Sequence, residues 1–332
     1  MKIAVIYSTQ AGHVIQHRGP LAHEEYPLEN VQRIVDALRV LEHEVVLLEG
    51  DQDIIERLQN FFGEVPDGQW PGLVFNLAFG MQGQLRYCQM PALLDTLGLP
   101  YIGSSPWGHA LASDKAAAKA LFQHYGLPTP AFAVMRSADD PDPGMSYPLV
   151  VKPVAEASSF GLHLVHTVRE MRDAVRENLV EYQQPVLVEQ FVDGRELSIS
   201  ILGNGSTAEP LPAVEVILST DGLPVYTRED KNGTALRRFE LLCPAAVSDA
   251  INGVLQRVAL QAFDVLHCRD WARVEFRMDE HDQLYLLEVN TLPGLGVLAS
   301  LPVSAKAIGL GDLPAVVNRL VQVATARYRD SA

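Results

Sequence analysis

Two glutamates, an asparagine and an arginine stand in one short stretch, residues 271–294, in a pattern that could bind a metal ion. Within it, a polar turn separates two segments of alternating character, which predicts a β-hairpin. Alternation would place Leu286, Glu288 and Asn290 on one face of the second strand. If the polar faces of the two strands coincide, Glu288 and Asn290 form a cluster of oxygen atoms with Glu275, and Arg273 lies beside it. Hard oxygen ligands at a strand end suit Mg²⁺ that is bridged to phosphates.

A half-exposed edge hairpin with solvent-facing charges would show much the same pattern. Glu288 favours the metal site, because it interrupts the nearly continuous apolar run L-Y-L-L-E-V-N. A carboxylate in such a run is costly unless it is paired or bound to a metal. We therefore expect a metal site on this hairpin.

Two lysines are candidates for binding phosphate. Lys152 ends an apolar strand expected at residues 149–153, and Lys115 lies in the first turn of a helix expected at residues 113–125, with Ser113 as its N-cap. The small residues after Lys152 could lay backbone N–H groups against an anion. A surface lysine and an ordinary connecting loop are the simpler interpretations. The chain has neither a G-x-x-x-x-G-K-[ST] loop nor a strand–G-x-G-x-x-G–helix unit, so P-loop and Rossmann sites are not expected.

The elements that must position these residues follow from the order of the apolar segments. Strands and helices alternate at the start of the chain: strands at residues 2–7, 44–48 and 73–77, and helices at residues 28–41 and 53–62. This order predicts a parallel sheet whose ligands lie beyond the carboxyl ends of its strands. We expect an α/β and α+β protein with three domains: an N-terminal parallel βα domain at residues 1–103, a central α+β domain at 104–188 and a C-terminal α+β domain at 189–332.

Composition limits the partners and the compartment. The 332 residues are 48% hydrophobic and 20% charged, as in an ordinary globular enzyme, and the net charge of −15 disfavours a nucleic-acid partner. The three cysteines have no C-x-x-C spacing, which fits a reducing cytoplasm. No apolar run approaches the roughly 20 residues of a membrane span, and the first apolar strand is too short for a signal peptide. We expect a cytoplasmic enzyme that acts on small molecules and binds no membrane.

Several motifs, in their order and spacing, resemble the D-alanine–D-alanine ligase branch of the ATP-grasp superfamily. They are N-L-A-F-G-M-Q-G-Q-L-R, P-A-L-L-D-T-L-G-L-P-Y-I-G-S, A-S-D-K-A-A-A-K, V-V-K-P-V-A-E-A-S-S-F-G, V-L-V-E-Q-F-V-D-G-R-E-L, A-R-V-E-F-R-M-D and L-L-E-V-N-T-L-P-G. The matches run from the first strand to about Pro302. The resemblance implies a three-domain ATP-grasp fold with ATP held between the central and C-terminal domains.

The resemblance also implies a role for individual residues around the nucleotide. Lys115 and Lys152 would contact the ATP phosphates, Glu189 and Val192 would face the adenine, and Glu196 would bind the ribose hydroxyls. Two Mg²⁺ ions, which Mn²⁺ could replace, would be held by the cluster read from the hairpin: Glu275, Glu288 and Asn290.

The remaining implied roles concern catalysis and the substrates. The loop closing over the transferred phosphate would contain Ser158, Ser159 and Gly161, and the oxyanion would be stabilised by Arg273 and the backbone of Gly294. Glu25 stands at the spacing of the family glutamate that grips the amino group of the first substrate, although a solvated acidic residue before a helix would look the same.

Four departures from the family pattern concern substrate selection or lid closure. The loop over the transferred phosphate reads Glu156-Ala157-Ser158-Ser159 where the family usually has E-G-S-S, and Lys231-Asn232 replaces the usual Lys-Tyr. Ala299, next to Ser300, stands where a family serine binds the carboxylate of the second substrate. Near the start of the chain, S-T-Q-A-G replaces paired glycines. None of them touches the metal cluster. We therefore expect the ATP half-reaction to be intact and the substrates to differ.

The resulting expectation is an ATP-dependent carboxylate–amine ligase that forms an amide bond through an acylphosphate and joins amino acids other than two D-alanines. One alternative is a genuine D-alanine–D-alanine ligase of cell-wall synthesis. Another is a non-catalytic nucleotide-binding module, which the costly carboxylate cluster argues against. The resemblance also suggests a homodimer.

Overall fold

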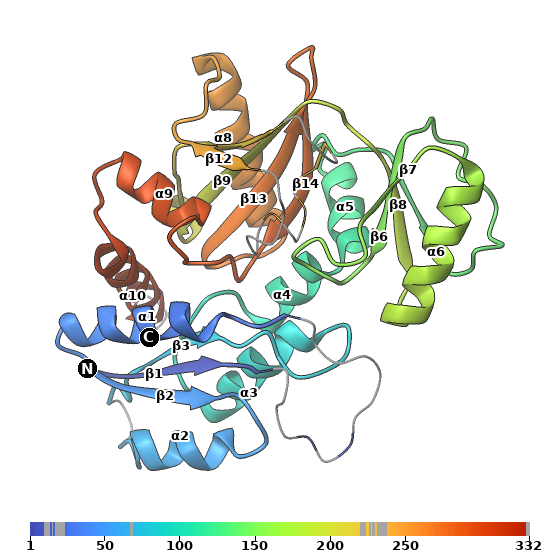
Figure 1. The fold of residues 1–332 in the computed structure, drawn as a ribbon. Coiled ribbons are helices and arrows are strands. Elements are labelled where there is room, and N and C mark those ends of the chain that lie inside the picture. Colours follow the sequence, from blue (N-terminus) through green and yellow to red (C-terminus); the bar gives the residue numbers. More distant parts are fainter. Residues whose placement is uncertain are drawn as a thin grey trace.

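A computed structural model of the chain describes residues 1–9, 14, 16, 24–66, 69–219, 224–225, 227, 230 and 238–329. The described residues form three sheets, each built from a separate stretch of the chain (Figure 1). The first sheet is parallel and the other two are antiparallel, so the mixed α/β and α+β class predicted from the sequence is confirmed.

The N-terminal sheet has helices on both faces (Figure 1). Its strand order is β2 (Glu44–Glu49), β1 (Lys2–Tyr7), β3 (Leu73–Leu77) and β4 (Tyr101–Ile102). Ile3 and Val5 face the core that contains α1 (Leu28–Val40) and α10 (Leu313–Arg329). Ala4 and Ile6 face the opposite core, under α2 (Ile54–Phe62) and α3 (Gln89–Leu97). Strands buried on both faces have continuous apolar sequences, which is why they are evident from the sequence.

The central sheet is covered on one face by α6 (Val168–Tyr182), as Figure 1 shows. Its strand order is β5 (Phe132–Met135), β8 (Val186–Gln190), β6 (Leu149–Pro153) and β7 (His163–Val165). The domain boundary expected at residue 188 falls inside β8, which pairs with both β5 and β6. The chain therefore leaves this sheet only after Gln190.

The C-terminal sheet carries the expected hairpin. Its order is β12 (Phe239–Leu242), β11 (Val214–Leu218), β9 (Arg195–Gly203), β13 (Asp270–Met278) and β14 (Leu284–Asn290), and β10 (Glu209–Pro210) also pairs with β9. The apolar face of β9 and β13 packs against α8 (Asp249–Val265). On the opposite face, Leu202 and Trp271 pack with α10, while Ser198, Arg273 and Glu275 line the site described below.

Two helices connect the N-terminal sheet to the central one: α4 (Pro106–Ser113) and α5 (Lys115–His124). The expected cap at Ser113 is wrong. The carboxylate of Asp114 accepts the backbone N–H groups of Ala116 and Ala117 over 3.0 and 2.9 Å, whereas Ser113 closes α4 and donates to the carbonyl of His109. Asp114 is the better cap because it is extended between the two helices and its carboxylate can accept both N–H groups.

The last helix returns to the first sheet. Although it follows the C-terminal sheet in the chain, α10 packs against α1 (Figure 1). Arg327 on α10 donates to Asp270 and to the carbonyl of Tyr101, which ties the end of β13 to β4. None of the helices in the described part of the chain combines the length and apolar character needed to cross a membrane.

Candidate active site

The hairpin brings the expected oxygen-bearing side chains together. In the antiparallel pair, Glu275 lies directly opposite Glu288, and Arg273 lies opposite Asn290. Nδ2 of Asn290 is 2.9 Å from Oε1 of Glu275 and 3.4 Å from Oε1 of Glu288. Nε and Nη2 of Arg273 donate to Oε1 of Glu275 over 2.9 and 2.5 Å. The polar faces of the two strands therefore coincide.

A β-bulge makes this arrangement possible. Glu275 pairs with Glu288 while Phe276 pairs with Leu286, so Leu287 is an extra residue in β14. The expected face shared by Leu286, Glu288 and Asn290 is therefore wrong for Leu286, which lies fully buried in the core. Bulges are common beside active sites because they redirect a side chain without ending the pairing. Here the bulge turns Glu288 toward Glu275.

The cluster fits a divalent cation whose coordination is completed by phosphate oxygens. Among the residues that the structure describes, no three His, Cys, Asp or Glu side chains gather as a metal site. The donors are instead two carboxylates and one amide, and Mg²⁺ is commonly held by one or two carboxylates together with substrate phosphates and water. The amide of Asn290 can present its oxygen after a flip, since the placement of its O and N is an assignment.

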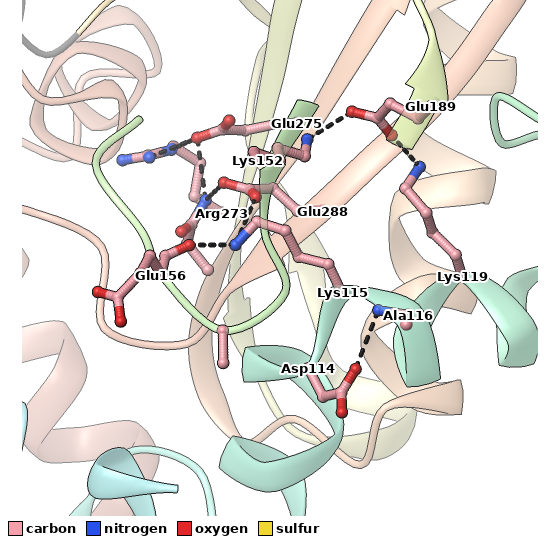
Figure 2. Close-up of polar contacts among 12 residues, drawn as sticks. Asp114, Lys115, Ala116, Lys119, Lys152, Glu156, Glu189, Arg273, Glu275 and Glu288 are labelled. Atoms are coloured by element: carbon pink, nitrogen blue, oxygen red, sulfur yellow. Dashed lines mark hydrogen bonds and ion pairs between the residues drawn. The ribbon is translucent and has the colours of Figure 1, made fainter. Parts of the chain in front are cut away.

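Lys115 points from the first turn of α5 into the cluster. Its Nζ is 3.4 Å from Oε2 of Glu288 and donates to the carbonyl oxygen of Glu156 (Figure 2). The residue is only 7% exposed, which excludes the simpler interpretation of an ordinary surface lysine. A buried ammonium group must be paired, and Glu288 is the carboxylate that faces it.

Lys152 approaches Glu189 from one side and Lys119 from the other (Figure 2). The N–O distances are 2.5 Å for Lys152 and 2.9 Å for Lys119. Burial would raise the pKa of Glu189, but the two ammonium groups outweigh it and lower the pKa to about 2. One carboxylate thus faces two cations, and the excess positive charge lies next to the metal cluster.

Lys119 was not among the residues expected from the sequence. Its signal is the spacing, because it stands four residues after Lys115 on the same helix and so projects from the same face. It is fully buried, and its Nζ also donates to Oγ1 of Thr129 over 2.8 Å.

Two cavities meet at the cluster. The first, which we call the slot, lies between the central and C-terminal sheets, and its apolar lining residues are Val150, Ala157, Phe160, Leu162, Phe191, Val192, Val225 and Leu287. Glu189 lines it too, with its carboxylate engaged by the lysines, and Glu196 lines it beside Arg277, at 3.3 Å. Arg277 is a second residue that the sequence did not single out. A slot lined by both apolar and acidic side chains suits a flat ring joined to a polar sugar.

The second, larger cavity encloses about 530 Å³ and shares Ala157, Glu196, Glu275 and Glu288 with the slot. One wall is aromatic: the rings of Tyr26 and Phe79 stack with centroids 5.4 Å apart, and Tyr87 lies 5.3 Å beyond Phe79. The rest of the lining includes Arg273, Gly294, Ala299 and Ser300, together with apolar residues of β11 and β12. Ser300 shares a 3.0 Å hydrogen bond with Ser198.

The loop at residues 155–161 lies between the two cavities. Ser158 lines the larger cavity and Ser159 the slot, and both have left-handed backbones, with φ of 53° and 61°. Two consecutive non-glycine residues in this region are costly and typical of functional loops. Gly161 also has a positive φ, and a Cβ there would lie 2.2 Å from Oδ1 of Asn178, so only glycine fits.

Other expected residues fall in three groups. Glu25 lines the larger cavity but is exposed, whereas its neighbour Glu24 is 5% exposed and bound to Arg86 at 2.7 Å. Val192 lines the slot. Lys231 and Asn232 lie outside the described residues.

Comparison with known proteins places these features in a family. A family model described as "D-ala D-ala ligase C-terminus" matches residues 121–322. The D-alanine–D-alanine ligase of Pelotomaculum thermopropionicum is 30% identical over 92% of this chain and 94% of its own length. That of Cupriavidus metallidurans is 38% identical over 67% of both chains. An uncharacterised protein of Sinorhizobium fredii is 36% identical over 99% of this chain and 98% of its own length.

Solved structures agree on the fold. The D-alanine–D-alanine ligase from Bacillus anthracis, complexed with ATP, superimposes with a TM-score of 0.77 at 20% identity and covers 100% of both chains. The ligase from Coxiella burnetii gives a TM-score of 0.76 at 21% identity, covering 100% of this chain and 95% of its own.

Proposed function

Because the chain belongs to the D-alanine–D-alanine ligase family and is an ADP-forming ATP-grasp ligase, we propose that it joins a carboxylate to an amine at the junction of its two cavities. An oxygen of the substrate carboxylate attacks the γ-phosphorus of ATP, which gives an acylphosphate and ADP. The amine of the second substrate then attacks the acyl carbon, loses a proton, and inorganic phosphate leaves.

The observation that carries this proposal is the position of the charged cluster. Glu275 and Glu288 line both the slot and the larger cavity, with Lys115 3.4 Å from Glu288. A phosphoryl group held at this junction would face a nucleotide on one side and an acceptor on the other. Such transfer depends on positioning and charge neutralisation more than on an acid–base residue.

The residues around the slot support the binding of ATP. We assign Lys115 and Lys152 to the phosphates, Glu189 and Val192 to the adenine side and Glu196 to the ribose. The carboxylate of Glu189 is occupied by Lys152 and Lys119, so its part in the adenine site is to hold these lysines and shape the slot.

Glu275, Glu288 and Asn290 would hold Mg²⁺, or Mn²⁺ in its place. Bound there, the metal would neutralise charge on the phosphate oxygens during transfer. Arg273 and the N–H group of Gly294 line the larger cavity and would stabilise the oxyanion formed at the acyl carbon. Ser158, Ser159 and Gly161 belong to the loop that would cover the transferred phosphate.

The larger cavity supports substrates other than two D-alanines. A D-alanine side chain is a single methyl group, whereas Tyr26, Phe79 and Tyr87 line a wall long enough for a ring or a branched chain. Ala299, also in the lining, stands where the family has a carboxylate-binding serine, and the adjacent Ser300 offers a hydroxyl. We propose that at least one substrate carries a larger apolar side chain than alanine.

A panel of L- and D-amino acids and dipeptides, screened for ADP release with ATP and Mg²⁺, tests both the ligase reaction and the choice of substrates. Mass spectrometry of the products identifies the joined pair. We expect ADP release with a bulky apolar substrate and an amide product. Robust turnover with D-alanine alone would instead identify a genuine D-alanine–D-alanine ligase, as the names of the relatives suggest. Binding of ATP without turnover of any member would favour a non-catalytic module.

The assembly and the compartment are proposals of a more general kind. A homodimer is suggested by the family resemblance, and light scattering of the purified protein measures it. A cytoplasmic location is suggested by the three free cysteines, Cys88, Cys243 and Cys268.

A further inference from the structure

A buried arginine lies behind the wall of the larger cavity. Arg86, in the short helix η1 (Arg86–Cys88), is 3% exposed and is not one of the described residues that line either cavity. Its guanidinium nevertheless contacts residues of the cavity wall and of the loop at residues 155–161, which we call the phosphate loop. A buried charge of this kind needs well-placed partners, because its desolvation is costly.

One partner belongs to the wall of the larger cavity. Nη2 of Arg86 donates to Oε2 of Glu24 over 2.7 Å, and the same oxygen accepts the hydroxyl of Tyr87 over 2.8 Å. Glu24 and Tyr87 both line the larger cavity. Arg86 therefore fixes the acidic corner of that wall and, through Tyr87, the end of the aromatic stack.

The other partner belongs to the phosphate loop. Nη2 and Nη1 of Arg86 lie 2.9 and 3.4 Å from the two carboxylate oxygens of Glu156, a paired arrangement that a lysine cannot make. Gln184 completes the contact: its Nε2 donates to Oε1 of Glu156 over 2.8 Å, and its Oε1 accepts the N–H of Ala155 over 2.6 Å. The beginning of the loop is thereby held by side chains from two other parts of the chain.

The backbone of Glu156 passes this restraint to Lys115. Its carbonyl oxygen accepts a hydrogen bond from Lys115, while its side chain points away from that lysine (Figure 2). Lys115 has Glu288 as its other charged neighbour, at 3.4 Å. A rotation of the Glu156 peptide would thus move the group that orients the lysine.

We propose that Arg86 is a positioning residue that fixes the carbonyl of Glu156 and, through it, Lys115. Arg86 also joins the phosphate loop to the wall of the larger cavity. The inference rests on the proposed function, since it takes Lys115 as a phosphate ligand. Without the guanidinium, the carboxylates of Glu24 and Glu156 would face each other in a buried place, and their repulsion would displace the loop.

Binding of the non-hydrolysable analogue AMP-PNP with Mg²⁺, measured by calorimetry on the full chain, tests this role. R86M should weaken binding about 10- to 100-fold, the loss usual for a residue that orients a ligand-binding group. R86K keeps the charge but loses the paired contact, so its affinity should lie between those of R86M and the wild type. R327M is the matched control, because Arg327 makes a comparable buried pair with Asp270, at 2.8 Å, and lines neither cavity among the described residues.

The outcomes distinguish a failure of the positioning role of Arg86 from a failure of the proposed function. If R86M binds AMP-PNP as tightly as the wild type, or if R327M loses as much affinity as R86M, the positioning role is wrong. If R86M does not fold, R86K and E156Q carry the test, and wild-type affinity in both would overturn it. If the wild type itself binds no AMP-PNP, the proposed function fails, whatever the variants do.

Discussion

The slot with its charged junction and the larger cavity are built in different ways. At the junction each described cation lies within about 3.4 Å of a carboxylate: Lys115 beside Glu288, Lys152 and Lys119 beside Glu189, and Arg273 beside Glu275. The larger cavity has, in addition, a wall of stacked aromatic rings, Tyr26, Phe79 and Tyr87. One region is specified by charge and the other by shape.

We infer that each region controls a different part of the reaction. Paired charges have little freedom, since moving one of them leaves another buried without compensation. An aromatic wall can change in size while the charges beside it stay in place. We therefore expect changes at the junction to affect phosphoryl transfer with every substrate, and changes in the wall to affect the choice of substrate.

The largest effect is expected from Glu288→Gln at the junction. The substitution keeps the shape of the side chain but removes a charge from the metal cluster, and should lower kcat about 10²- to 10³-fold with every substrate. ADP release under saturating ATP measures the change. Glu280→Gln, in the exposed turn of the same hairpin, is the control and should leave kcat unaltered. Equal rates for E288Q and the wild type would show that phosphoryl transfer does not need the charge of Glu288.

The next effect is expected from Lys119→Met. Glu189 would lose one of its two cations, and the remaining pair with Lys152 would shift, so the KM for ATP should rise about 10- to 100-fold. Lys306→Met, at an exposed lysine, serves as the control. A change in the KM for the amino acid alone, with the KM for ATP unaltered, would show that Lys119 acts on amino-acid binding and not on ATP binding.

A smaller and selective effect is expected from Phe79→Ala. Removing the middle ring of the stack should lower kcat/KM for a bulky apolar substrate by about 10- to 200-fold, the range for a change in an apolar pocket. The KM for ATP should stay the same, because Phe79 does not line the slot. Steady-state kinetics with two substrates of different size measures the ratio. A uniform loss for both substrates would contradict selection by shape.

The smallest effect appears only in acid. The pKa of Glu189 is about 2 in the folded protein, below its ordinary value of 4.5, so the ion pairs stabilise the fold above pH 4.5. This stabilisation is lost as the pH falls from 4.5 toward 2, since the unfolded carboxylate takes up its proton first. Denaturant unfolding at about pH 6 and about pH 3 measures the difference, which should be smaller in Glu189→Gln. An equal difference in both proteins would show that Glu189 is not the group responsible.

Local pattern was sufficient for several elements. β1 and β3 have the bounds expected from the sequence, because a strand buried on both faces leaves a continuous apolar run with sharp ends. The alternation along the hairpin and the interrupted apolar strand indicated that Glu275 and Glu288 could lie close together. Lys115 was found because a lysine in a first helical turn is a local feature.

Two of the misses, the bulge in β14 and the role of Arg86, were decided by partners distant in the sequence. The bulge at Leu287 depends on packing Leu286 and Val289 into the core while Glu288 meets Glu275. Arg86 reads as an ordinary loop residue until the fold brings Glu24 and Glu156 to its guanidinium.

Residue types at short spacing were enough to predict the family, the alternating βα start and the chemistry of the hairpin. Tertiary structure decided which charges pair, which face of β14 holds Glu288, and that three aromatic residues from the first domain line the larger cavity. The physical reason is that burial and charge compensation are properties of the assembled fold. A side chain's cost or use is set by neighbours that the chain supplies from far away.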